Sequence, residues 1–173
     1  MRIISESGEA DAYLRLQLPA QAVPHYQKLI SLRPSLLSAR HKLGQSLRLS
    51  GQVEEATKLY AGLLRINQAD TVAHRAMATL LETANDPRAA LIHRLALLRL
   101  EGGKPEDYET LLARLLAAKM TSDAIGLLES GHERHPDHAS LTLRLAELDR
   151  LDVERRLALV DAFLTLEYSE ALS

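Results

Sequence analysis

The chain has 173 residues, of which 46% are hydrophobic, and its 21 basic and 23 acidic residues give a formal net charge of −2. This length and hydrophobic content predict about one folded domain with a sizeable core, and the small net charge gives no general attraction to nucleic acid or to an anionic membrane surface. The chain has no cysteine, which excludes disulfides, thiol nucleophiles and cysteine zinc ligands.

The N-terminal stretch 1–14 contains one Arg and two Glu, without the apolar core that a signal peptide requires. Apolar runs elsewhere are interrupted by charge before they reach the ~20 residues of a membrane span. Leu, Ala, Arg and Glu are abundant and aromatic residues make up 3% of the chain, a composition that favours helices over sheets. We therefore expect a cytoplasmic, all-α protein that neither inserts into a membrane nor binds nucleic acid.

An internal period of 34 residues organises the sequence. One column of this period consists of alanine alone: Ala22, Ala56, Ala90, Ala124 and Ala158. A second column contains mostly small residues: Ala10, Gly44, Ala78, Leu112 and Ala146. Unbroken periods of this length are typical of stacked supersecondary units. The sequence therefore predicts five copies, which start near residues 3, 37, 71, 105 and 139.

Each copy contains two amphipathic stretches of about twelve residues, with apolar positions three and four apart, joined by a polar turn. The turn at 49–55 contains Gly51, and the turn at 83–89 contains the sequence Asn-Asp-Pro. The turn at 150–156 contains an Asp. These residue types end one helix and cap the next. Neither helix can bury its apolar face alone, so each pair is expected to stack on its neighbours.

The clearest copy carries a recognisable pattern of residues: Leu43-Gly44, Leu47, Gly51, Ala56 and Tyr60. This pattern resembles the tetratricopeptide repeat (TPR) family. The resemblance covers 3–172 and implies one all-α domain, a right-handed superhelical solenoid of antiparallel helix pairs. The copies depart from the family where Arg40 and His74 occupy the first aromatic position, and the fifth copy has Asp149 where a large residue usually stands.

The segment HERHPDH at 132–138 places three histidines three residues apart, and imidazole is a favoured zinc ligand. His132, however, belongs to an apolar column of the repeat, while His135 and His138 fall in the loop between two copies. Pro136 stands in the same register as Pro34, just past a helix. We interpret the segment as a helix end followed by a turn, and we expect no metal, no cofactor and no catalytic residue in the chain.

The TPR resemblance implies a non-catalytic protein-protein interaction or scaffold module, whose first helices line a concave groove for a peptide. Carried over by position, the central groove residues are His41, Lys42, Gln45, Arg48, Arg75, Thr79 and Glu82. Basic residues outnumber acidic residues in this set. We expect His41, Arg48 and Arg75 to receive an acidic group of a partner, since Arg donates two hydrogen bonds to a carboxylate.

The last predicted helix has a second apolar face, formed by Val153, Leu157, Val160 and Leu164. A helix that is apolar on two sides is normally buried on both. One interpretation is a homo-oligomer contact through this face. Another is that the chain is the N-terminal TPR segment of a larger bacterial enzyme, such as a glycosyltransferase, sulfotransferase or methyltransferase, and serves oligomerisation or substrate recruitment. A third is that the tail folds back over this surface.

Overall fold

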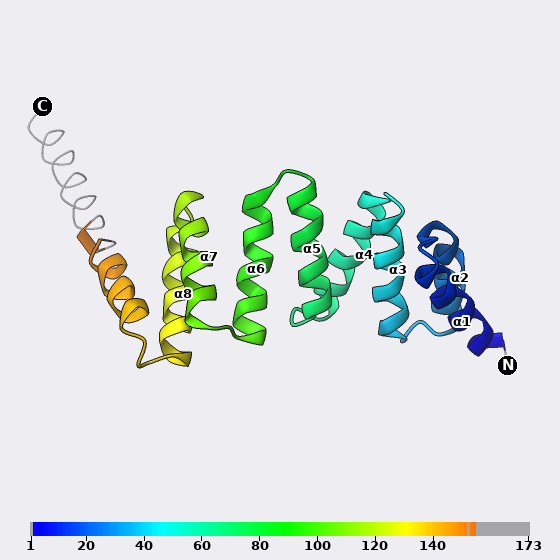
Figure 1. Ribbon diagram of the computed structural model, residues 1–173, viewed down its shortest axis with the longest axis horizontal. Coiled ribbons are helices and arrows are strands. Elements are labelled where there is room, and N and C mark those ends of the chain that lie inside the picture. Colours follow the sequence, from blue (N-terminus) through cyan, green and yellow to red (C-terminus); the bar gives the residue numbers. More distant parts are fainter. Residues whose placement is uncertain (1, 152, 155–173) are drawn as a thin grey trace, which may run out of the picture. The chain divides into compact units, whose positions relative to one another are not determined.

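A computed structural model describes residues 2–151, 153 and 154, with side chains from residue 6 onward. Eight complete helices lie in this part of the chain (Figure 1): α1 (Arg2–Arg15), α2 (Pro19–Leu32), α3 (Leu37–Leu49), α4 (Val53–Ile66), α5 (Thr71–Thr83), α6 (Pro87–Glu101), α7 (Pro105–Ala117) and α8 (Thr121–Arg134). Residues 139–151, 153 and 154 are helical as well, and no strand occurs among the described residues. The predicted all-α class is confirmed.

The chain divides into two compact units, Met1–Glu101 and Gly102–Ser173. In the first unit α1 pairs with α2, α3 with α4, and α5 with α6, while α7 pairs with α8 in the second. The first helices of the copies begin at Arg2, Leu37, Thr71, Pro105 and residue 139. The expectation of a single domain over 3–172 stays a prediction. None of the described helices combines the length and the apolar character needed to cross a membrane.

The alanine column lies where the two helices of a copy touch. Its four described members are 0 to 2% exposed: Ala22, Ala56, Ala90 and Ala124. The helices of the second copy are also close at Gly44, because a Cβ added there would lie 2.5 Å from Cζ of Tyr60. The Tyr60 ring therefore fills the space that a side chain at position 44 would need.

The turn inside each described pair has one recurring backbone geometry. The second residue after the first helix is left-handed in each described pair: Gln17 (φ 60°), Gly51 (φ 81°), Asn85 (φ 59°) and Lys119 (φ 58°). In the second copy the Gly51 N–H donates to the Arg48 carbonyl at 3.2 Å, and the Gln52 N–H donates to the Leu47 carbonyl at 2.8 Å. This is the Schellman motif, which satisfies the last carbonyls of the first helix.

Three of the four described linkers between copies share a second turn, at 33–36, 67–70 and 135–138. In each, the fourth residue donates its N–H to the carbonyl of the first, at 3.0 to 3.2 Å. The linker at 101–104 lacks this turn, because α6 continues to Glu101 and Gly102 is left-handed with φ 76°. The two units divide at this irregular linker.

A pair of histidines joins α5 to α6. Nδ1 of His74 and Nδ1 of His93 are 2.9 Å apart, and Nε2 of His74 is 2.9 Å from the carbonyl of Gln68. A carbonyl only accepts, so His74 carries its proton on Nε2 and accepts from His93 through Nδ1. Burial lowers the pKa of His93, and a positive charge on His74 would lower it further.

Substitutions at the left-handed turn position are predicted to change stability in opposite directions. Gly51→Ala should lower the free energy of unfolding by about 1 kcal/mol, because a Cβ disfavours this backbone region. Nothing lies within 4 Å of that Cβ, so the effect is one of backbone conformation. Lys119→Gly should raise the free energy of unfolding by up to about 1 kcal/mol. Urea unfolding followed by circular dichroism measures both, and a loss of stability in Lys119→Gly would contradict the assignment.

Two glycines within helices provide a matched test of the close approach between α3 and α4. Gly44→Ala should destabilise the chain by about 1 to 3 kcal/mol, since the buried Tyr60 ring has to move. Gly62→Ala should be neutral or stabilising by up to about 1 kcal/mol, because its nearest contact would be 3.9 Å away. Both variants gain the same helix propensity, so the difference in their urea midpoints reports the clash. Equal midpoints would show that Tyr60 moves freely.

The lowered pKa of His93 predicts a loss of stability in mild acid. The unfolded chain protonates this histidine near its ordinary pKa of about 6.5, whereas the folded chain resists protonation. The unfolded state therefore binds more protons below that pH, and stability falls as the pH falls. His93→Gln should flatten this decline in urea unfolding measured from about pH 7 to pH 5. A control variant, His132→Gln, should keep the wild-type slope; equal flattening in both would remove His93 as the cause.

Candidate functional site

Side chains of α3 and α5 line a groove in the first unit with a volume of about 360 Å³. The lining residues are His41, Lys42, Gln45, Arg48, Tyr60, Val72, Arg75, Ala76 and Thr79. Six of the seven residues expected in a groove are thus brought together, from positions on the first helices of two successive copies. Glu82 is not part of the lining, and its carboxylate binds the guanidinium of Arg94 on α6 at 2.7 Å.

The groove borders the packed interface between α3 and α4. The Tyr60 side chain reaches it from α4, and its hydroxyl donates to the His41 carbonyl at 3.2 Å. Burial raises the pKa of Tyr60 to about 12, although the positive charge of Arg48 acts in the opposite direction. The phenol therefore stays neutral at physiological pH, and its ring lies buried beside the more exposed Val72 and Ala76.

One polar contact ties the groove to the start of α5. Nε2 of His41 lies 2.7 Å from Oδ2 of Asp70, which is 5% exposed. The other oxygen of Asp70 accepts the backbone N–H of Ala73 at 3.0 Å and so caps α5. A single carboxylate therefore starts one helix and orients an imidazole on the preceding first helix.

A second polar contact joins the groove to the first copy. The Lys42 ammonium lies 2.7 and 2.8 Å from the two oxygens of Asp11, and Tyr26 donates its hydroxyl to Oδ1 of Asp11 at 2.5 Å. Desolvation raises the pKa of the Asp11 carboxyl, but the hydrogen bonds from Lys42 and Tyr26 outweigh it and lower the pKa overall. Asp11 is thus ionised and compensates the charge of Lys42.

The two arginines of the groove differ in their partners. Nη2 of Arg75 lies 2.8 Å from both oxygens of Glu101 at the end of α6. Arg48 is half-buried and has no carboxylate partner among the described residues. Of the four basic side chains that line the groove, Arg48 is therefore the one whose charge the described part of the chain leaves without an ion pair.

The histidines of 132–138 make three separate sets of contacts. Nδ1 of His132 lies 3.0 Å from the hydroxyl of Thr142, and Nε2 of His135 donates to the carbonyl of Gly103 at 2.7 Å. The His135 ring also meets the edge of Tyr108, with centroids 5.7 Å apart. His138 has a buried Nδ1 without a hydrogen-bond partner in the described chain. These rings serve the end of α8 and the linker that follows it.

The proposed C-terminal contact surface lies mostly beyond the described chain. Val153 is 55% exposed, whereas Leu157, Val160 and Leu164 lie outside the described residues. The role of this face stays a prediction.

No protein-family model and no curated protein matches the chain. Several solved structures do. MamA from residue 41 to its end, from Desulfovibrio magneticus RS-1, is 12% identical over 98% of this chain and 96% of its own, with a TM-score of 0.59. A putative kinesin light chain from Podosopora anserina, with nearly identical TPR-like repeats, is 15% identical over 91% of this chain and 90% of its own, with a TM-score of 0.54.

YrrB, described as a TPR protein with an unusual peptide-binding site, is 18% identical over 84% of this chain and 75% of its own, with a TM-score of 0.53. At these identities the likeness establishes the fold alone. The 34-residue period, the paired helices and these neighbours together show that the chain has the tetratricopeptide-repeat fold predicted from its sequence.

Proposed function

We propose that the chain is a non-catalytic, cytoplasmic protein-interaction module whose groove between α3 and α5 binds a peptide segment of a partner protein. The observation that carries the proposal is the groove of about 360 Å³ in which Arg48 lacks an ion pair within the described chain. The peptide-binding site in the description of YrrB belongs to that protein. It supports the proposal because both chains share the repeat fold.

The chemistry of the groove defines the segment it would bind. Arg48 is half-buried, so a carboxylate that reaches it would form a charge-assisted, bidentate pair in a partly desolvated setting. The neighbouring surface of Val72 and Ala76 would cover an apolar side chain. The preferred partner is therefore an extended or helical segment in which an acidic residue lies close to an apolar one.

His41, Lys42 and Arg75 play a different part in this proposal. Each is already paired with a carboxylate of the chain, namely Asp70, Asp11 and Glu101. An incoming acid would have to displace these carboxylates or share their hydrogen-bond donors, so these three residues shape the groove and contribute less to affinity than Arg48.

Arg48→Gln is expected to weaken binding of an acidic peptide by about tenfold or more, because a hydrogen bond to a charged group contributes about 1.5 to 3 kcal/mol. The peptide would come from a phage-displayed library of random peptides selected on the full chain. Its affinity for wild type and variants would be measured by fluorescence anisotropy.

The matched control is Arg65→Gln, since Arg65 is exposed on α4 and lines no part of this groove. It should bind the peptide like wild type. Selected peptides without enrichment in Asp and Glu, or equal losses in the two variants, would rule out recognition through Arg48.

A further inference from the structure

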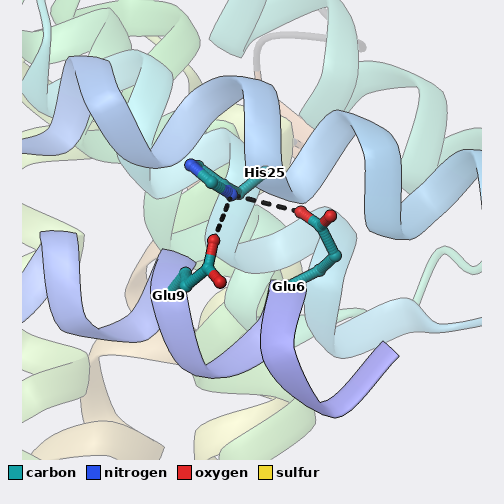
Figure 2. Close-up of side chains that lie close together, drawn as sticks. All are labelled: Glu6, Glu9 and His25. Carbon is teal, nitrogen blue, oxygen red and sulfur yellow. Dashed lines mark hydrogen bonds and ion pairs between the residues drawn. The ribbon is translucent and has the colours of Figure 1, made fainter. Parts of the chain in front are cut away.

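A donor cluster outside the groove joins α1 to α2. Among the described residues, Glu6, Glu9 and His25 form the one group whose ligand atoms all lie within 4.8 Å of one another. Figure 2 shows the carboxylates of Glu6 and Glu9, from successive turns of α1, both facing the same nitrogen of His25. Nδ1 of His25 is 3.1 Å from Oε2 of Glu6 and 3.4 Å from Oε2 of Glu9.

We propose that Glu6, Glu9 and His25 form a Zn²⁺ site, with water in the fourth position. Zinc binds imidazole nitrogen and carboxylate oxygen at about 2.0 to 2.2 Å in tetrahedral geometry, so neighbouring ligand atoms lie about 3.4 Å apart. The two distances from Nδ1 already match that spacing. The ligand oxygens of the two carboxylates lie within 4.8 Å of each other, so an ion at the centre would draw them closer together.

The alternative to a metal is a proton, and the geometry suits it less well. A single hydrogen on Nδ1 can point at one oxygen with good geometry, yet both carboxylates approach the same nitrogen. Two carboxylates held this close also repel each other. A divalent cation shared by all three groups would offset this repulsion.

The residues around the cluster hold two of its members in place. Lys28 binds Oε1 of Glu6 and leaves Oε2 facing His25, and the Glu6 side chain is 10% exposed. The Tyr13 ring lies 5.3 Å from the His25 ring, centroid to centroid. Bonds and packing that orient the ligands are a usual part of metal sites in proteins. The Glu9 side chain is 54% exposed, which leaves a path for the ion.

Zinc titration by isothermal calorimetry tests the site in the full chain, prepared without a histidine tag and freed of metal with a chelator. Wild type should bind one Zn²⁺ per chain and should not bind Mg²⁺, which prefers oxygen ligands. Glu9→Gln and His25→Phe should each weaken zinc binding by about tenfold or more. Zinc should also raise the melting temperature of wild type, because it binds only the folded site, and should raise it less in both variants.

His132→Gln is the matched control, because it removes a histidine from the other histidine-rich segment and should bind zinc like wild type. Circular dichroism would verify that the variants are folded; Glu9→Gln is a mild change at an exposed side chain. Absence of saturable binding would overturn the proposal and leave the cluster as an ion pair. Zinc binding that is unchanged in Glu9→Gln and His25→Phe but lost in His132→Gln would overturn it as well. The proposal does not depend on the groove, so either one can fail alone.

Discussion

The close approach of the two helices in each pair is the constraint on which the other features of the first unit depend. Ala22 and Ala56 are fully buried at this contact, and a small residue there lets the second helix lie against the first. Tyrosines one turn further on then reach back across the pair. Tyr26 donates to Asp11, and Tyr60 donates to the His41 carbonyl. Because Asp11 is also bonded to Lys42 on α3, and His41 to Asp70, which caps α5, packing within one pair helps to set the polar contacts with the next pair.

The repeat could be predicted from the sequence because it rests on local, periodic residues. Small residues recur at the helix contact, and groove positions share one face of each first helix. The ion pairs of the groove could not be predicted in this way. Lys42 with Asp11 and Arg75 with Glu101 join residues 31 and 26 apart, in no common column. The first pair depends on how the second copy stacks on the first, and the second pair depends on how α6 packs against α5 within the third copy. The sequence therefore predicted a basic groove, whereas three of its four basic side chains are each paired with a carboxylate of the chain itself.

In the fourth copy, residues at the contact between the two helices differ from those of the other copies, yet the helices still pack closely. It has Leu112 where the second copy has Gly44, and Gly131 where the first three copies have leucine. Tyr108 explains the exchange, because a Cβ on Gly131 would lie 2.8 Å from its ring. The aromatic residue thus occupies the first aromatic position of this copy, and a glycine on α8 makes room for it. This compensation cannot be recognised from one position of the repeat alone, because Tyr108 and Gly131 lie on different helices.

The same position gives rise to the proposed metal site. In the first and third copies the aromatic residue is replaced by Glu6 and by His74, and each contacts a histidine 19 residues later, His25 or His93. A polar residue between two packed helices needs a partner, and the second helix supplies one at that distance. In the first copy Glu9 adds a second carboxylate one turn along α1. Clustered histidines in the sequence do not reveal this site, because its three residues come from two helices and only one of them is a histidine. The loss of an aromatic residue from the repeat pattern is the sequence signal that leads to it.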